Sequence, residues 1–314
     1  MIDRGFHLQD HDLYRYVFDM AVQIPKGMVS TYGSIAISLG DRAASRAVGM
    51  VLAADHERPF TVPCHRVIYS DGRTGWYTGA GRGEERKREI LLSEGVPIDQ
   101  GKVLDLERTV FKDFRIDPIL SRMADSQREL APLVSMEGDA GRFERIAGLD
   151  VSYDGDEAFA AMVTVDRQGN VLEERTARCH VNFPYVPGYL GFREMRPYSL
   201  LLDVPRQDTL YLLDGHGRAH PRRAGIACQF GVVHGIAVGG VAKSILTGKK
   251  ENDSLILDDV EVGRVVVNHQ GRKRFVSVGH CVDLASLCSV VSSLPKDPTT
   301  LAHDLCTRHR KGIR

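Results

Sequence analysis

Apolar side chains recur at helical spacing in the first third of the chain. Between residues 11 and 23 they fall on one face and predict a helix that ends before Pro25; they are Leu13, Val17, Met20 and Ala21. Further short helices are predicted from Thr31 and over about 42–54, joined by a glycine-containing turn at 39–41. This pair fits a DNA-binding helix-turn-helix, although on periodicity alone an ordinary helical hairpin is the commoner arrangement.

The pattern changes in the middle of the chain. A short strand is predicted at 101–106, a helix over 117–135 and a loop over 136–141. We therefore place a boundary near residue 115, which gives domains 1–115 and 116–314.

The second domain opens with strands. Apolar segments at 145–153, 159–165 and 171–181 predict a β-meander, with a strong hairpin signal at 166–170. A further apolar strand is predicted at 209–214.

Length and composition favour an ordinary globular protein. With 314 residues, 43% of them hydrophobic and 26% charged, the chain is long enough for two domains with cores of their own. Its longest apolar stretch, 226–246, is interrupted by polar side chains and rich in glycine, so it predicts buried core and not a membrane span. The N-terminus lacks the apolar segment of a signal peptide, so we expect a cytoplasmic protein without membrane association.

Charge and cysteine content bear on how the protein could bind nucleic acid and on the compartment in which it works. Lys plus Arg and Asp plus Glu both total 41, so any nucleic acid must bind through local surfaces. The six cysteines, at 64, 179, 228, 281, 288 and 306, include no CxxC pair. They indicate a reducing cell interior and argue against a disulfide framework or a zinc site.

One cysteine has the surroundings of a nucleophile. In Pro63-Cys64-His65-Arg66-Val67 the thiol lies between a rigid proline and two cationic or protonatable side chains. Such neighbours favour the thiolate, which is the reactive form. The alternative is a buried structural cysteine.

The motifs around Cys64 favour the nucleophile. They are Ser30 to Ala36, Ala44 to Met50, Gly75 to Gly79 and Leu91 to Gly95, in this order. The set resembles the DNA-binding, active-site domain of the O6-alkylguanine-DNA alkyltransferases and their alkyltransferase-like relatives, over about the first 110 residues. The resemblance implies a mostly helical, winged helix-turn-helix-like domain that needs no cofactor, without the amino-terminal domain that many alkyltransferases carry.

This resemblance also implies roles for individual residues. Cys64 would attack the alkyl carbon, and His65 and Glu94 would lower the pKa of its thiol through a bridging water. Arg46 would take the place of the extruded base, and Tyr32 would help to rotate the nucleotide out of the stack. Tyr77 would help the guanine to leave.

Two departures bear on this half. The family's usual asparagine shortly before the cysteine motif is missing from 54–59, where Asp55 follows Ala54, and the loss affects positioning on DNA more than chemistry. Many alkyltransferase-like proteins carry tryptophan in place of the cysteine and only bind lesions. Retention of Cys64 favours alkyl transfer, and a lesion-binding module that recruits or orients the second half is the alternative.

Of the predicted strands of the second domain, 145–153 ends near an aspartate, Asp150, and 209–214 ends in one, Asp214. Converging strand-end carboxylates can bind Mg²⁺, although single ones usually form turns. The surrounding motifs are 148–153, 183–188, 191–194, 214–222, 240–244 and 278–280. In this order they resemble endonuclease V from about residue 117 to the end, which implies an α/β, RNase H-like fold with a mixed central sheet flanked by helices.

The second resemblance implies a metal site and a DNA-binding surface. Asp150, Glu194 and Asp214 match the metal-site carboxylates, with Mg²⁺ as cofactor and Mn²⁺ as its substitute, while Lys243 matches a lysine near the scissile phosphate and His280 the active-site histidine. The matched DNA contacts are the strand-separating wedge from Tyr185 through Pro187 to Gly188, and small residues around a flipped hypoxanthine: Gly188, Gly215 and Gly225.

Together the two resemblances predict a monomeric, bifunctional DNA repair protein. Its partner would be double-stranded DNA that contains O6-alkylguanine or deoxyinosine. One half would transfer an alkyl group to Cys64 once per molecule, and the other would cleave the second phosphodiester bond 3′ to deoxyinosine. For the nuclease, inosine-containing RNA is the alternative substrate.

Overall fold

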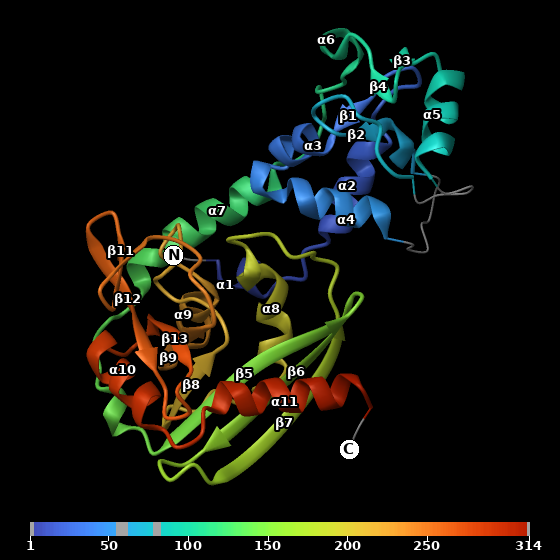
Figure 1. Ribbon diagram of the computed structural model, residues 1–314. Helices are drawn as coiled ribbons and strands as arrows, with labels where there is room; N and C mark the ends of the chain where they lie inside the picture. Colours follow the sequence, from blue (N-terminus) through green and yellow to red (C-terminus); the bar gives the residue numbers. More distant parts are fainter. Residues whose placement is uncertain (1–2, 55–61, 78–82, 313–314) are drawn as a thin grey trace. The chain divides into compact units, whose positions relative to one another are not determined.

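The computed structural model describes residues 3–54, 62–77 and 83–312 (Figure 1). Its contacts divide the chain into two compact units. The helical unit comprises Asp12–Arg122 and Asn182–Pro187, and the sheet unit comprises Met1–His11, Met123–Val181 and Gly188–Arg314. The division near residue 122 falls within a helix, so the boundary expected near residue 115 stays a prediction. The segment that lacks the asparagine, 55–61, lies outside the described residues.

The helical unit confirms the helices expected from periodicity. They are α2 (Leu13–Ala21), α3 (Tyr32–Ser38) and α4 (Ser45–Ala53), the last preceded by a 3₁₀ turn at Arg42–Ala44. Thr31 begins α3 because its hydroxyl accepts a hydrogen bond from the Ser34 N–H at 2.9 Å. Since α3 and α4 pack against each other through a short turn, the arrangement is that of a helix-turn-helix.

Short strands and two more helices complete this unit. Strand β1 (Ser30–Thr31) pairs in parallel with β2 (Val67–Ile68), and β3 (Ile98–Asp99) pairs antiparallel with β4 (Lys102–Val103). The strand predicted at 101–106 is thus confirmed but shorter. Helices α5 (Glu84–Ser93) and α6 (Leu106–Thr109) were not predicted, because their charged sequences carry little apolar periodicity.

Helix α7 (Ile119–Leu130) fulfils the prediction for 117–135 in part. It gives way to a 3₁₀ turn at Ala131–Leu133. Pro132 has no N–H and clashes with the preceding turn, so the α-helix ends before it.

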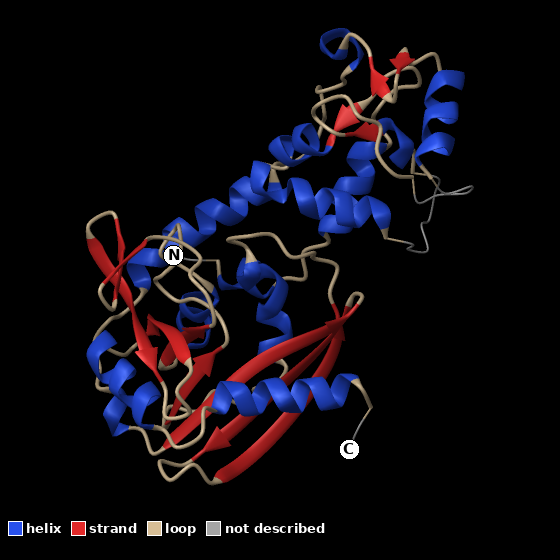
Figure 2. Cartoon of the chain, in the orientation of Figure 1, coloured by secondary structure: helices blue, strands red, loops and turns tan. Residues whose placement is uncertain are grey.

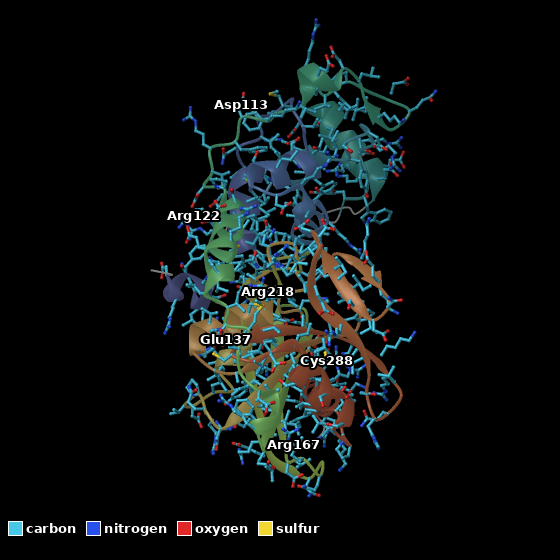
Figure 3. All side chains as sticks on the ribbon, turned by 90° about the vertical axis from the view of Figure 1, so that its left-hand side faces the viewer. Asp113, Arg122, Glu137, Arg167, Arg218 and Cys288 are labelled. Atoms are coloured by element: carbon cyan, nitrogen blue, oxygen red, sulfur yellow. The ribbon has the colours of Figure 1, made fainter. Side chains whose placement is uncertain are left out.

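A mixed nine-stranded sheet organises the sheet unit, in the order β10-β11-β12-β13-β9-β8-β5-β6-β7. The expected meander is confirmed as β5 (Arg145–Asp154), β6 (Glu157–Val165) and β7 (Val171–His180), all antiparallel. Arg167, labelled in Figure 3, lies in the β6–β7 turn and donates from Nε to the carbonyl of Phe143 at 2.8 Å.

The centre of the sheet is parallel. Strand β8 (Thr209–Leu213) lies between β5 and β9 (Val238–Ala242) and runs parallel to both. The remaining strands are antiparallel: β10 (Lys249–Glu251), β11 (Ser254–Leu257), β12 (Val260–Val267) and β13 (Lys273–His280). The sheet is therefore mixed, as the second resemblance implied.

Helices cover both faces of the sheet (Figure 2). On one face α10 (Leu284–Ser293) and α11 (Pro298–Arg310) pack over Ile146 and Leu212, and on the other α8 (Leu190–Ser199) and α9 (Ile226–His234) pack over Leu149 and Leu213. Alternate residues of one strand thus enter different cores. The stretch 226–246 forms α9 and β9, which are buried, and no described helix is both long and apolar enough to cross a membrane.

The first residues of the chain pack on the sheet unit. Helix α1 (Arg4–Leu8) contacts α8 and α9, and His7 is 1% exposed. Its Nδ1 lies 3.2 Å from Oε1 of Gln229. The sheet unit is therefore built from both ends of the sequence.

Candidate functional site

Cys64 begins a 3₁₀ turn (Cys64–Arg66) that leads into β2, and only 7% of its surface is exposed. The cysteine is therefore both buried and set among polar groups, which combines the two readings of the sequence. Val67 and Ile68 of β2 are fully buried and fix the backbone that carries the thiol.

Next to the thiol, His65 and Arg66 both bind the carboxylate of Glu94 at the end of α5. His65 Nε2 lies 3.1 Å from Oε1. Arg66 donates from Nε to Oε2 at 2.8 Å and from Nη2 to Oε1 at 2.7 Å, a bidentate pair, while its Nη1 donates to the carbonyl of Ile24. The structure thus brings together the predicted Cys64, His65 and Glu94, and adds Arg66 as the side chain that fixes Glu94.

The electrostatics suit proton acceptance by His65. Burial lowers the pKa of His65, against the opposing effect of Glu94. Burial raises the pKa of Glu94, but the hydrogen bonds from Arg66 and His65 outweigh it and leave that pKa below its usual value. At neutral pH the arrangement therefore holds a neutral imidazole against an ionised carboxylate.

A buried lysine lies close to this cluster. Lys87 of α5 is 1% exposed, and its Nζ donates to the carbonyl of Val67 at 2.7 Å. Burial lowers its pKa to about 8. Sequence reasoning did not single it out, because lysines on a charged helix are usually solvated.

Two of the three remaining predicted residues of this half line a groove of about 710 Å³. Tyr32 and the exposed Arg46 line it together with Tyr69 and Trp76. Tyr32 and Tyr69 have ring centroids 5.5 Å apart, and burial raises the pKa of Tyr32 to about 12, so it stays a neutral phenol. Tyr77 instead packs edge-on against His65, at 6.3 Å.

In the sheet unit, strand pairing brings two predicted carboxylates together. Leu149 of β5 lies opposite Leu213 of the parallel strand β8, and the N–H of Asp214 donates to the carbonyl of Leu149 at 3.1 Å. Asp150, within β5, and Asp214, just after β8, therefore follow paired residues of two neighbouring strands. This convergence is what the strand-end aspartates predicted.

The carboxyl group of Glu194, on α8, interacts through charge with both Asp150 and Asp214. Burial and the charge of Asp150 raise its pKa to about 8, and burial with the charge of Asp214 raises the pKa of Asp150 to about 6. Tyr153 Oη donates to Glu194 at 3.4 Å, and the guanidinium of Arg193 lies 3.8 Å from the Tyr153 ring centre. The buried carboxylates thus repel one another in the absence of a cation.

Lys243 contacts a carboxylate of the site, whereas the contact described for His280 is with the main chain. Lys243 forms an ion pair with Asp214; burial lowers its pKa, but the bond and charge of Asp214 outweigh this and raise it. The hydrogen bond described for His280 comes from the N–H of Ser135 to Nδ1, at 3.1 Å. The catalytic role expected of His280 stays a prediction.

A histidine that sequence reasoning missed contacts the site. His303 of α11 lies with Nδ1 2.6 Å from Oδ2 of Asp150. The ligand atoms of Asp150, His303 and Cys306 all lie within 4.8 Å of one another, a spacing that the predicted Asp150, Glu194 and Asp214 do not reach among the described residues. The sequence signal was the spacing of three between His303 and Cys306 on a terminal helix.

The predicted small residues lie where backbone approaches closely. A Cβ on Gly225 would come within 2.2 Å of the carbonyl oxygen of His216, and one on Gly215 within 2.6 Å of Ile226. Gly188 has a φ of +81°, and its carbonyl accepts from His220 Nε2 at 3.0 Å. In the helical unit, Tyr185 and Pro187 are exposed.

The residues of the sheet unit fit a divalent cation. Burial and, second to it, the neighbouring carboxylate charges raise the pKa values of Asp150 and Glu194, and a cation would offset both effects. Nearby, the buried Nδ1 of His216 has no hydrogen-bond partner among the described residues. Asp150, Asp214 and Glu194 would hold the ion.

Both halves match known families. Residues 128–304 match the family described as Endonuclease V, and residues 12–96 match the one described as 6-O-methylguanine DNA methyltransferase, DNA binding domain.

Relatives match the whole chain. A bifunctional methyltransferase/endonuclease of Picrophilus torridus is 35% identical over 309 residues, covering 97% of this chain and 99% of the relative. One of Thermoplasma volcanium is 31% identical, covering 96% and 91%. The crystal structure of endonuclease V from Streptomyces avermitilis is 36% identical, with a TM-score of 0.56, and the match covers 61% of this chain and 92% of that one.

Proposed function

Because the chain belongs to the bifunctional methyltransferase/endonucleases and, over 128–304, to the endonuclease V family, we propose that it repairs DNA in two ways. The helical unit takes an alkyl group from O6-alkylguanine onto Cys64. The sheet unit cleaves the second phosphodiester bond 3′ to deoxyinosine with a divalent metal, Mg²⁺ in the cell. The relatives' names give the two activities, and the proposal adds the substrates.

For alkyl transfer, the cluster of Cys64, His65 and Glu94 is the supporting observation. Neutral His65 accepts the thiol proton through a water, and Glu94 stabilises the resulting imidazolium. The thiolate attacks the alkyl carbon, so that an S–C bond forms while the C–O6 bond breaks. The departing guanine takes a proton from Tyr77, and the thioether is permanent.

The nucleotide must leave the helix for this attack, because the alkylated oxygen is inaccessible in the stack. Tyr32 and Arg46 line the same groove, where an aromatic ring can press on the backbone and a guanidinium can enter the vacated stack. This supports the roles that the sequence implied for both.

For the nuclease, the supporting observation is the proximity of Asp150, within β5, to Asp214, at the end of the parallel strand β8. A bound divalent metal would polarise the phosphoryl group and supply a nucleophilic water at neutral pH. Lys243, paired with Asp214, places a positive charge where the scissile phosphate approaches. His303 orients Asp150 through the contact at 2.6 Å.

One experiment separates the two activities. A duplex with a single deoxyinosine is incubated with Mg²⁺ or with chelator, using wild type, Asp150→Ala and Cys64→Ala. We expect nicking by wild type and Cys64→Ala, and none with chelator or Asp150→Ala. Undiminished nicking by Asp150→Ala would refute the assignment, and cleavage confined to matched inosine-containing RNA would identify RNA as the substrate.

Alkyl transfer is tested on the same proteins with a duplex carrying labelled O6-methylguanine. We expect wild type and Asp150→Ala to take up one methyl group per chain, and Cys64→Ala to take up none. Binding of the lesion without uptake by wild type would show a recognition module in place of an alkyltransferase.

A further inference from the structure

Trp76, the single tryptophan of the chain, lines the groove of the helical unit with most of its surface in solvent. It is 65% exposed, and Met50 of α4, which lines the same groove, is 52% exposed. Isolated apolar residues are common on protein surfaces, but two of them in one groove indicate a binding surface. The sequence implied no role for either residue.

The backbone that carries Trp76 is fixed. Thr74 is fully buried, and its N–H donates to the carbonyl of Gly101 at 3.2 Å. Gly75 has a φ of +73°, and a Cβ there would lie 2.6 Å from Cε2 of Tyr69, so the glycine lets the backbone pack directly on that ring. An aromatic ring on a fixed backbone loses little freedom when a flat partner stacks on it.

The next residue connects the groove to the reactive cysteine. Tyr77 packs edge-on against His65, which follows Cys64 in the chain. Cys64 itself is 7% exposed and is not among the described residues that line the groove. A base on the ring of Trp76 would therefore be close to the reactive cluster without yet being at the thiol.

The chemistry of the groove fits nucleic acid. Arg42 and Arg46 bring two guanidinium groups to it, Tyr32 and Tyr69 bring aromatic rings, and its described lining residues include no carboxylate. Guanidinium groups attract phosphates, while aromatic faces stack on bases that have left the helix. A volume of about 710 Å³ is that of sites which hold whole small molecules, so a complete nucleotide fits.

We propose that Trp76 is a specificity-determining residue of alkyl transfer, whose ring stacks on the extruded base in the groove before that base moves on to Cys64. The proposal rests on the proposed alkyl-transfer function. A damaged base leaves the helix at a lower cost than a normal one, so it is captured on the ring more often. Trp76 thereby selects the alkylated base before the chemical step.

The fluorescence of Trp76 reports the stacking directly, because the chain has no other tryptophan. The full-length Cys64→Ala protein is titrated, with chelator present, with three duplexes: one containing O6-methylguanine, one unmodified, and one with an abasic site at the lesion position. We expect the methylguanine duplex to quench the emission about two-fold or more, and the other two to quench it much less. Equal quenching by the abasic duplex would overturn the proposal, because that site has no base to stack.

Binding of the same duplexes is followed in parallel by the anisotropy of a dye on the DNA. Preferred binding of the methylguanine duplex without quenching would overturn the role of Trp76 and leave the alkyl-transfer function intact. No preferred binding, together with no methyl uptake by wild type, would refute the alkyl-transfer function itself and the proposal with it.

Three variants of the Cys64→Ala protein assign the effect to the ring. Trp76→Ala should bind the methylguanine duplex about ten-fold more weakly than Trp76→Phe, which keeps an aromatic face, while both bind the unmodified duplex equally. Leu104→Ala, at an exposed apolar residue of the same unit outside the groove, is the control and should bind like its parent. Equal binding of the methylguanine duplex by Trp76→Ala and Trp76→Phe would refute the stacking.

Rapid mixing of the wild-type protein with the methylguanine duplex tests the order of events. The quench of Trp76 should appear before methyl uptake, because the base reaches the ring first. A quench that forms only at the rate of methyl uptake would overturn this order, since the ring would then meet the base no earlier than the thiol does.

Discussion

The buried charges around Cys64 differ in how their neighbours compensate them. Glu94 is held by Arg66 and His65, whereas Lys87 has a main-chain carbonyl as its described hydrogen-bond partner. A bidentate ion pair compensates for desolvation better than one bond to a neutral acceptor. Glu94 therefore keeps its charge readily, and Lys87 holds its proton at a cost in stability.

Lys87 makes the stability of the helical unit depend on pH. Its folded pKa of about 8 lies below the ordinary 10.5, so the unfolded chain binds the proton more tightly. The cost of burial is complete below pH 8 and is relieved as pH rises from 8 to 10.5, by up to about 3 kcal/mol. Urea unfolding followed by the fluorescence of Trp76, the single tryptophan, should show this rise.

Lys87→Met should remove the rise by abolishing the titrating group. Lys26→Met, at an exposed lysine of the same unit, is the control and should retain it. A wild-type protein whose urea midpoint stays constant over this range would contradict the prediction.

Arg66 acts by positioning Glu94, and lysine cannot reproduce its bidentate pair. Arg66→Lys should therefore lower the second-order rate of methyl uptake about ten-fold or more while the protein stays folded. Arg73→Lys, at an exposed arginine that pairs with Asp71, should leave the rate unchanged. Equal rates for both variants would show that Glu94 needs no such support.

At the scale of elements, the position of α11 depends on a glycine in β5. A Cβ on Gly148 would lie 2.1 Å from the carbonyl carbon of Pro298, at the first turn of the helix. The backbones of α11 and β5 thus meet without a side chain between them. This close approach brings His303 and Cys306 to Asp150.

Gly148→Ala should push α11 away from the sheet. We expect a loss of about 1–3 kcal/mol in the stability of the sheet unit and a marked decrease in nicking, because the His303 contact to Asp150 is broken. Methyl uptake by the same molecule is the internal control and should not change. Normal nicking by the variant would mean that α11 does not position the nuclease site.

At the scale of the whole molecule, the N-terminal residues belong with the sheet unit. His7 is bound to Gln229, Phe6 and His11 pack around Phe192, and Asp10 pairs with Arg196. A nuclease built from 116–314 alone would lack these contacts. The sheet unit therefore needs residues from both ends of the chain.

Deletion of residues 1–11 should destabilise the sheet unit by about 2–4 kcal/mol, because it exposes Phe192 and leaves Gln229 without its His7 partner. The loss should appear in circular dichroism as a lower melting temperature of the sheet unit. Trp76 lies in the helical unit, so its fluorescence does not report this transition. His7→Ala should reproduce part of it, and Leu8→Ala, at an exposed position, should not. An unchanged transition after deletion would contradict the packing.

Much of the fold could be predicted from local patterns. The helices α2, α3 and α4, the β5–β7 meander and β8 all have a clear apolar pattern, because each element buries one of its faces or lies wholly within a core. Helices α5 and α8 and the short strands β10 and β11 could not be predicted in this way, because charged faces, an internal Pro197 and the small number of residues per strand blur the signal.

The sequence by itself determined which groups are candidates for the chemistry: a thiol beside a histidine, and one aspartate within and one just after an apolar strand. Only the tertiary structure decided their partners, because Arg66 with Glu94, His303 with Asp150 and α1 with α9 are contacts between segments far apart in the chain. Local periodicity reflects burial of one element at a time. The pairing of elements depends on close approach, such as that at Gly148, which no local pattern records.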